Sequence, residues 1–504
     1  MKENNFFSKY YFLSVGLSTY PVSLLLSINF QNTDLIMYLI PIVVVYLFSS
    51  VVYLLFFLFK EKLKLKNFHL SVSIITIIFF TYGILYSYLY ESRGLLGRHR
   101  FLIPLPFILI FITIYIVNKL KEKGSSYYFA IIFLSILNVI PFVTLITKGI
   151  SIKSIKPTQS ISLHKTNAKK LPNIYYIILD GYGSGESMKK LFNYDNSNFT
   201  DQLKYLDFEV QEKAKSNFNL TVFSLSSTLN LNYIQDIIKG NIYENEAQKL
   251  ISNNAVLKTL ERYGYYYYIF DSGFGLKKQY KKNEVLVKTY KDNTVEDFLF
   301  ATSGQDVLNS FISNSMLMVY KYNLSLRFYS ERILNVFKRL PEISKIPERK
   351  FVFVHILSPH PPYLFDENGK YKANSNENWN ADLHIKQLKF INAKTLLVLK
   401  SIIKNDKSEK IIILQGDHGS RIIPKTKVLS LNQKWVHEEY SILNAIYISK
   451  KDKSREIIYN NWKHSSVNSF RIIFNEYFNY KLPLLNDKKY DFELKKSYHF
   501  NEIK

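Results

Sequence analysis

The segment Asn173-Ile-Tyr-Tyr-Ile-Ile-Leu-Asp180-Gly181-Tyr182-Gly183 decides the fold of the larger part of this chain. It is apolar over the length of a strand and then ends in an acid followed by glycines. Strands that are apolar at every position predict a largely parallel sheet covered by helices on both faces. Runs of this kind alternate with longer amphipathic stretches that suit helices, and they lie at Ile174–Leu179, Tyr265–Phe270, Phe351–Leu357, Ile411–Gln415 and Leu443–Ile448.

Two of these predicted strands end in an acid, at the edge of a parallel sheet where ligands bind. Asp180 closes the first run, and Gly416-Asp417-His418-Gly419 closes the run that begins at Ile411. Either motif alone is also typical of a turn that only ends a strand. Two acid-tipped strands in one sheet favour a metal site, because carboxylate oxygen and imidazole nitrogen together suit zinc or manganese.

A third predicted strand runs into a loop that carries two histidines. The segment reads Phe351-Val-Phe-Val-His355-Ile-Leu-Ser-Pro-His360-Pro-Pro-Tyr363. His355 lies inside the apolar run, which is typical of a packed, hydrogen-bonded core residue rather than a ligand. His360 follows the end of the strand, so we expect it in the site.

The first 150 residues differ in composition from the rest, with long apolar runs separated by short charged loops. A membrane-spanning helix takes about 20 mostly apolar residues, because its backbone polar groups must be satisfied within the segment. A cleaved signal peptide is the alternative for the first run, which lacks a small-residue cleavage site and is followed by further runs. We expect five transmembrane helices, at Tyr10–Phe30, Leu35–Phe59, Phe68–Tyr90, Phe101–Val117 and Tyr127–Ile146.

Lysines in the short loops predict the orientation of this anchor, because Lys and Arg accumulate on the cytoplasmic side of a membrane. They precede the first predicted span and fill the loops after the second and the fourth. We therefore expect a cytoplasmic N-terminus in a multi-pass protein of the cell (cytoplasmic) membrane. The predicted organisation is an anchor over 1–148, a polar linker over 149–171 and an extracytoplasmic α/β domain over 172–504.

The net charge and the cysteine content limit which partners this protein can bind and which side chains can bind a metal ion. The net charge of +25 at pH 7 would suit nucleic acid, since a basic surface releases counterions on binding phosphate. Export of the larger domain argues against that partner. The sequence has no cysteine, so a metal ion must be bound by nitrogen and oxygen ligands.

The three motifs, in this order behind a five-span anchor, resemble the alkaline phosphatase and sulfatase superfamily. The resemblance is to its membrane-bound branch of lipoteichoic acid synthases and phosphoethanolamine transferases, and it implies an alkaline-phosphatase-like α/β domain. Later segments, from Glu438 to Tyr447 and from Val467 to Asp487, extend the match. The resemblance assigns metal-binding roles to Asp180, Asp417 and His418, and a site role to His360. That branch usually has Glu where this chain has Asp180, which leaves the ligand chemistry intact.

The resemblance also implies a nucleophile, Thr221, with Ser224 as the reserve. Thr221 lies in Asn217-Phe-Asn219-Leu-Thr221-Val-Phe-Ser224, which resembles the nucleophile segment of the branch. From the residues alone, the same stretch is also a glycosylation sequon or a helix cap. Sulfatases require a Cys or Ser in a Cys/Ser-x-Pro-x-Arg motif for conversion to formylglycine. The sequence lacks that motif, which disfavours sulfate ester hydrolysis by that route.

The function that the resemblance implies is metal-dependent transfer of a phospholipid-derived phospho-headgroup, of phosphoglycerol or phosphoethanolamine type. The acceptor would be an envelope glycan or lipid, and the intermediate would be covalently linked to Thr221. The alternatives are a phosphodiesterase or phosphatase that uses water as acceptor, and a non-catalytic envelope scaffold that keeps the fold.

The implied cofactor is one or two divalent ions, Mn, Zn or Mg, held by Asp180, Thr221, Asp417 and His418. His360 and His437 are candidates for a second ion or for the substrate, and a surface position beside two glutamates is the alternative for His437. Arg98 and Arg100 lie in a loop that the predicted topology places outside. They are candidates for binding an anionic lipid headgroup, or form a plain interfacial basic loop.

Overall fold

The computed structural model describes residues 9–29, 39–62, 64–91, 102–121, 124–150, 163–168, 171–240, 242–272, 284–287, 307–374, 380–421, 438–494 and 497–503. The chain forms two compact units. The first comprises 1–155 together with 293–325, and the second comprises 156–292 together with 326–504. The segment 293–325, which the sequence analysis placed in the exported domain, therefore belongs with the N-terminal unit.

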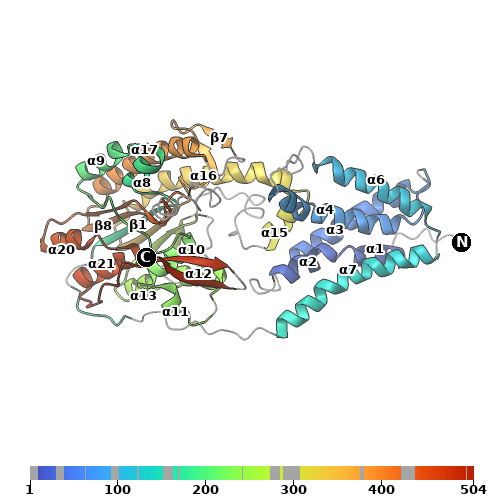
Figure 1. The fold of residues 1–504 in the computed structure, drawn as a ribbon, viewed down its shortest axis with the longest axis horizontal. Coiled ribbons are helices and arrows are strands. Elements are labelled where there is room, and N and C mark those ends of the chain that lie inside the picture. The colour runs from blue at the N-terminus through green and yellow to red at the C-terminus, as the bar shows by residue number, and fades with distance from the viewer. Residues whose placement is uncertain are drawn as a thin grey trace. The chain divides into compact units, whose positions relative to one another are not determined.

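The first unit is helical (Figure 1). Its helices are α1 (Lys9–Leu17), α2 (Tyr20–Asn29), α3 (Leu39–Phe59), α4 (Phe68–Glu91), α6 (Pro104–Lys119), α7 (Ser125–Ile150) and α15 (Val307–Asn314). Among the described residues, two helices are long and apolar enough to cross a membrane, over Pro41–Phe59 and Phe68–Leu89. Shorter apolar helices span Pro104–Lys119 and Ser125–Pro141.

The first predicted span is divided into two helices rather than continuous. α1 ends at Leu17, and α2 begins at Tyr20 with Pro21 as its second residue. Proline has no backbone N–H, so it is accommodated in the first turn of a helix and interrupts a helix that would run through it. Hydropathy alone predicts one continuous helix here, because it does not register the missing N–H of Pro21.

The second unit is built around a mixed seven-stranded sheet with the order β2-β9-β8-β1-β5-β3-β4. The strands of the sheet are β1 (Asn173–Leu179), β2 (Glu209–Val210), β3 (Tyr266–Phe270), β4 (Glu284–Val287), β5 (Lys350–Ile356), β8 (Lys410–Gly416) and β9 (Asn444–Ile448). β8, β1, β5, β3 and β4 are parallel, whereas β9 is antiparallel to β8 and β2 to β9. All five predicted strands are present.

Helices cover both faces of this sheet (Figure 1). One face carries α8 (Gly185–Phe192), α9 (Ser197–Tyr205), α17 (Ala381–Asn405) and the part of α16 (Met318–Ile343) that begins at Leu326. The other carries α10 (Thr221–Leu229), α11 (Ile234–Ile237), α12 (Glu244–Ser252), α13 (Ala255–Glu261), α20 (Lys453–Asn461) and α21 (Ser469–Phe478). A short 3-10 helix, η3 (Ser466–Asn468), precedes α21.

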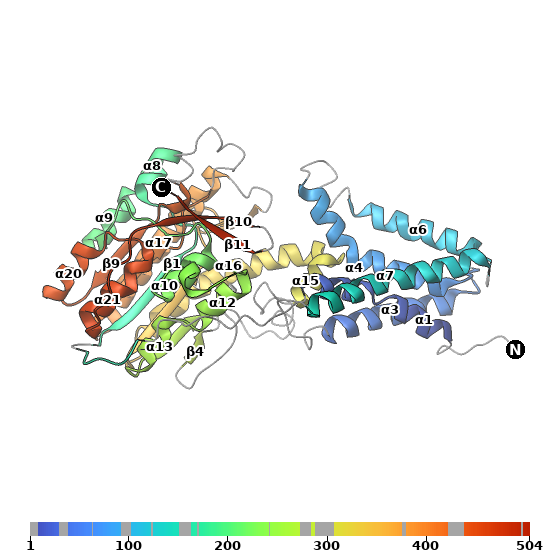
Figure 2. The same ribbon diagram turned by 60° about the horizontal axis from the view of Figure 1, so that its bottom comes forward.

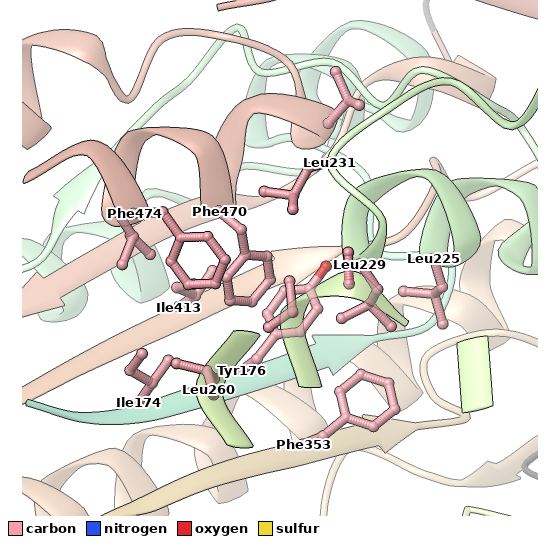
Figure 3. Packing of buried hydrophobic residues seen from close by; sticks show 14 of the residues in the cluster. Ile174, Tyr176, Leu225, Leu229, Leu231, Leu260, Phe353, Ile413, Phe470 and Phe474 are labelled. Atoms are coloured by element: carbon pink, nitrogen blue, oxygen red, sulfur yellow. The ribbon is translucent and has the colours of Figure 1, made fainter. Parts of the chain in front are cut away.

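The strand β1 shows why these strands are apolar throughout. Its even-numbered residues, among them Tyr176, enter the core beneath α10 and α21, and its odd-numbered residues, among them Tyr175, enter the core beneath α17. Figure 3 shows Tyr176 packed against Phe470 of α21, and their ring centroids are 5.1 Å apart. Successive side chains of a strand point to opposite faces, so a strand covered on both sides must be apolar at every position.

Two hairpins were not foreseen from the sequence. They are β6 (Tyr363–Phe365) with β7 (Tyr371–Asn374), and β10 (Lys489–Leu494) with β11 (Tyr498–Ile503). The second hairpin lies beside α10 (Figure 2), where Phe223 contacts Tyr498 and Phe500 with ring centroids 4.8 and 4.9 Å apart. In the second hairpin, alternating polar and apolar residues give each strand one packed face.

Candidate active site and metal centre

Two acids meet because their strands are neighbours in register. β1 and β8 are parallel, and Leu179 pairs with Gly416 at the last position of both strands. Asp180 and Asp417 follow immediately, so both leave the sheet at its carboxyl edge. This is the edge at which the sequence analysis expected a site. Both side chains are buried, at 5% and 2% exposure.

His418 stands between the two carboxylates. Its Nε2 atom lies 3.5 Å from Oδ1 of Asp180 and 3.5 Å from Oδ2 of Asp417. Oγ1 of Thr221 lies 3.3 Å from the same nitrogen. The four residues to which the resemblance assigned the primary metal site therefore converge, although Thr221 lies 197 residues before His418 in the sequence.

The donor atoms of this cluster fit a bound cation. Nδ1 of His418 lies 2.7 Å from the carbonyl oxygen of Gly419. A carbonyl can only accept, so Nδ1 carries a proton, and Nε2 is the nitrogen that can offer a lone pair to a cation. Oδ1 of Asp180 and Oδ2 of Asp417 are buried and have no hydrogen-bond partner among the described residues. Buried carboxylate oxygens without a partner are costly, and a divalent ion would offset that cost.

The local fold places Thr221 at a helix start. Thr221 is the first residue of α10 and is 8% exposed. Backbone N–H groups at a helix N-terminus favour a phosphate group. Ser224, the reserve nucleophile, donates its hydroxyl hydrogen to the carbonyl oxygen of Asp417 at 2.7 Å. That hydroxyl is thus engaged in holding the loop after β8.

Both histidines of the β5 segment reach the site. His360 follows the end of β5, and its ring centroid lies 5.9 Å from that of His418. Asp180, His360 and His418 can each offer a ligand atom within 4.8 Å of the others. His355 is buried as expected, but Nε2 of His355 lies 3.3 Å from Oδ2 of Asp180. His355 therefore contacts the site, which its apolar surroundings in the sequence concealed.

These imidazoles decide the charge of Asp180. Burial by itself would raise the pKa of the Asp180 carboxyl. The neighbouring imidazoles of His360, His355 and His418 outweigh that effect and hold the pKa below its ordinary value. Asp180 is therefore ionised at neutral pH, as a cation ligand must be.

A second group of acids beside the site was missed by the sequence analysis. Oε1 of Glu438 accepts the hydroxyl hydrogen of Ser420 at 2.9 Å, and Oε2 of Glu439 accepts from Nδ2 of Asn219 at 2.6 Å. Both acids are buried. They precede β9, which is antiparallel to β8, so the start of β9 lies at the edge where β1 and β8 end. The adjacent acids just before an apolar strand were the available signal.

Three other candidate residues lie outside the described residues. His437 immediately precedes the described segment that starts at Glu438. Arg98 and Arg100 fall between the described segments that end at Glu91 and begin at Leu102.

Comparison of the sequence with protein-family models and with curated proteins finds no match. Among solved structures, the lipooligosaccharide phosphoethanolamine transferase EptA of Neisseria meningitidis is similar at a TM-score of 0.43 and 13% identity. That similarity covers 92% of this chain and 95% of EptA.

Two further solved structures are similar over about two thirds of the chain. The periplasmic domain of EptC from Escherichia coli has a TM-score of 0.41 and 14% identity, and 68% of this chain and 96% of that domain are covered. The phosphoglycerol transferase GacH of Streptococcus pyogenes, in complex with sn-glycerol-1-phosphate, has a TM-score of 0.34 and 12% identity, with 62% and 80% covered. The solved structures similar to this chain include phosphoethanolamine and phosphoglycerol transferases, a protein of the alkaline phosphatase superfamily and a sulfatase from Bacteroides thetaiotaomicron.

Proposed function

We propose that this chain is a membrane-anchored, metal-dependent transferase that moves a phospho-headgroup from a phospholipid to an envelope glycan or lipid. The headgroup is of phosphoglycerol or phosphoethanolamine type. The observation that carries this proposal is the convergence of the Thr221 hydroxyl with Nε2 of His418 and with one carboxylate oxygen each of Asp180 and Asp417. Neither oxygen has a hydrogen-bond partner among the described residues. A hydroxyl, a cation site and a helix N-terminus together suit attack on a phosphodiester.

In the first step, Oγ1 of Thr221 attacks the phosphorus atom of the lipid. The Oγ1–P bond forms, and the bond between phosphorus and the diacylglycerol oxygen breaks. The hydroxyl proton of Thr221 passes to the departing diacylglycerol oxygen, with the His360 imidazole as its carrier, because an imidazole both accepts and donates near neutral pH.

In the second step, a hydroxyl of the acceptor attacks the same phosphorus atom and the Oγ1–P bond breaks. The acceptor proton restores the Thr221 hydroxyl, so no further reactant is consumed. A divalent ion held by Asp180, Asp417 and His418 would lower the pKa of the Thr221 hydroxyl and offset the negative charge of the phosphate. Water in place of the acceptor makes the same residues a phosphodiesterase.

The remaining candidates complete the proposal. His360 and His437 remain the candidates for binding a second ion or the substrate. Arg98 and Arg100 belong to the N-terminal part of the chain, and a planar guanidinium matches the geometry of a lipid phosphate. Two apolar helices of that part are long enough to cross a bilayer. A lipid donor is the substrate that such an anchor would keep within reach.

The test is transfer from headgroup-labelled phosphatidylglycerol or phosphatidylethanolamine by the purified full chain, with and without a candidate acceptor. Thr221→Ala should lose at least about 10³-fold of the activity, since it removes the nucleophile, with metal content and melting temperature preserved. Before acceptor is added, the peptide that contains Thr221 should gain the mass of the headgroup phosphate. Full activity of Thr221→Ala would overturn the proposal, and label released as the free phosphorylated headgroup would identify a hydrolase.

A further inference from the structure

A short helix from the middle of the sequence packs among the N-terminal helices. α15 (Val307–Asn314) contacts α2, α3 and α4. Phe311 and Ile312 are 1% and 5% exposed and share one apolar cluster with Val22, Val45 and Phe80. The rings of Phe311 and Phe80 are stacked, with centroids 4.7 Å apart.

The backbone of this segment approaches α4 more closely than side chains allow. At Gly83, an added Cβ would lie 1.9 Å from the carbonyl oxygen of Ser313, so only glycine fits there. One turn earlier on α4, the carbonyl oxygen of Phe79 accepts a hydrogen bond of 2.8 Å from the backbone N–H of Met316. Close approach at a small residue is the way in which helices associate inside membranes, where apolar burial gives no driving force.

The contact of α15 with α3 and α4 lies within the length of both candidate spans. Its depth is measured along each helix from the end that lies on the same side of the membrane. Gly83 precedes the end of the span at Leu89, and Val45 follows the start of the span at Pro41. At 1.5 Å per residue these positions are about 9 Å and about 6 Å inside the ends of the two helices. The start of α3 and the end of α4 lie on one side, because consecutive spans run in opposite directions.

The backbone N–H groups of the turn between α15 and α16 all have partners within the protein. The backbone N–H of Ser315 donates to the carbonyl of Ile312 at 3.1 Å, and that of Leu317 donates to Oγ of Ser315 at 3.1 Å. The N–H of Met318 donates to the carbonyl of Ser315 at 3.1 Å, and that of Met316 is held by Phe79. Irregular backbone at membrane depth is tolerated only when its polar groups have partners.

The sequence agrees with burial in lipid. Residues 307–320 carry no charged side chain, whereas Asp306 precedes them and Lys321 follows. An uncharged stretch of this length is too short to span a bilayer, and its length suits a re-entrant or interfacial segment or a helix buried in the protein. Leu317, at the turn, is 42% exposed, as a residue that faces lipid tails would be.

We propose that residues 307–317 form a re-entrant membrane segment that holds the α/β part of the chain to the bilayer at a second point. The first point is the covalent connection after α7. Both ends of the segment lead into the α/β unit, at residues 292 and 326, so the segment enters and leaves the membrane on one side. Together with the proposed function, on which this sentence rests, the second attachment would keep the α/β part tethered to the bilayer that holds its lipid donor.

Cysteine accessibility tests the location, because the sequence has no native cysteine. We expect Leu317→Cys in nanodiscs to resist a membrane-impermeant maleimide and to react after denaturation. Tyr205→Cys, at a position 90% exposed on α9, is the control that should react in both states. Rapid labelling of Leu317→Cys in intact nanodiscs would overturn the proposal.

Cleavage of the linker tests the attachment. A protease site is inserted between residues 155 and 160 of the full chain, and the N-terminal fragment is captured through a tag in mild detergent after cleavage. We expect the fragment 160–504 to be retained, to be released by Gly83→Leu, and to be retained by the matched control Gly16→Leu, where an added Cβ meets nothing within 4 Å. The proposal would be contradicted if the fragment 160–504 stayed bound in the Gly83→Leu variant, or if it were released from the chain that keeps Gly83.

An activity measurement separates this inference from the proposed function. Gly83→Leu should lower kcat/KM for a bilayer phospholipid by about tenfold or more, corresponding to about 1.4 kcal/mol, and leave kcat/KM for a soluble aryl phosphodiester unchanged. Equal losses on both substrates would overturn the membrane role. No turnover of either substrate by the unsubstituted chain would count against the proposed function, while the accessibility and cleavage results would stand.

Discussion

The backbone N–H of Gly181 donates a hydrogen bond of 3.0 Å to Oδ1 of Asp417, which ties the loop after β1 to the loop after β8. Gly181 has a φ of +67°, a conformation that glycine adopts without the strain that a side chain would bring. The bond uses one carboxylate oxygen of Asp417 and leaves Oδ2 beside Nε2 of His418. The fold thus orients the carboxylate for a cation before any cation is bound.

Asp417→Asn should remove metal affinity while the fold is retained, because the amide oxygen can still accept from Gly181 but the ligand charge is lost. We expect the metal dissociation constant to rise by more than the roughly 10–100-fold that loss of an outer partner of a ligand costs, measured by metal content after dialysis against a chelator buffer. The comparison variant is Asp406→Asn, near the start of β1 and away from the site. Asp406 accepts hydrogen bonds from the side-chain amide of Asn173 at 2.9 Å and from the hydroxyl of Tyr175 at 2.6 Å. It should lose about 1–3 kcal/mol of stability and keep its metal; equal metal loss in both variants would contradict the assignment.

His355→Phe should impair the site through Asp180, because Nε2 of His355 lies 3.3 Å from Oδ2 of that carboxylate. Outer partners of metal ligands typically contribute 10–100-fold in affinity or activity. We expect a loss of about tenfold or more in kcat/KM together with weaker metal binding. His355→Gln, which retains a donor, should recover part of both. Unchanged metal affinity in His355→Phe would show that His355 only packs in the core.

Gln387→Leu should loosen the loop that carries His360. Nε2 of Gln387 donates to the carbonyl oxygens of Pro359 and His360 at 3.2 and 3.3 Å. Its Oε1 atom accepts from the backbone N–H of Leu364 at 2.6 Å. Leaving these buried groups unpaired should cost about 3 kcal/mol of stability, read as a lower melting temperature, and should lower kcat. Lys386→Ala, on the exposed neighbouring position, should change the stability by less than about 0.5 kcal/mol.

The ion pair of Asp207 with Arg455 should make a small, pH-dependent contribution. The hydrogen bond from Arg455 holds the pKa of the Asp207 carboxyl below its ordinary value, with Lys451 contributing and burial opposing. A carboxyl with a lowered pKa in the folded state stabilises above its unfolded pKa of about 3.9, and the stabilisation is lost as the pH falls through the folded pKa.

Asp207→Asn should therefore cost less than about 1 kcal/mol at pH 7, because the side chain is 39% exposed and solvent screens the pair. The difference in melting temperature between this variant and the unsubstituted chain should shrink as the pH is lowered below about 4. A difference that persists undiminished at pH 3 would show that the effect is not electrostatic.

The sequence by itself determined the strands of the sheet and the residues at their ends. A strand buried on both faces must be apolar at every position, so β1, β5 and β8 were visible as runs, and Asp180, His360 and the Asp417-His418 pair followed from where those runs stop. These are local relations between neighbouring residues. Hydropathy likewise marked the helices of the N-terminal part, although it did not show the interruption at Pro21.

Tertiary structure alone decided the direction of β9, the contact of His355 with Asp180 and the docking of α15. The pattern of an apolar strand is the same in either direction, so only pairing with β8 brings Glu438 and Glu439 to the carboxyl edge. His355 can reach Asp180 only because β5 lies beside β1 in the sheet. The packing of Phe311 against Phe80 joins residues far apart in the chain. Each depends on contacts between distant segments, which no local periodicity encodes.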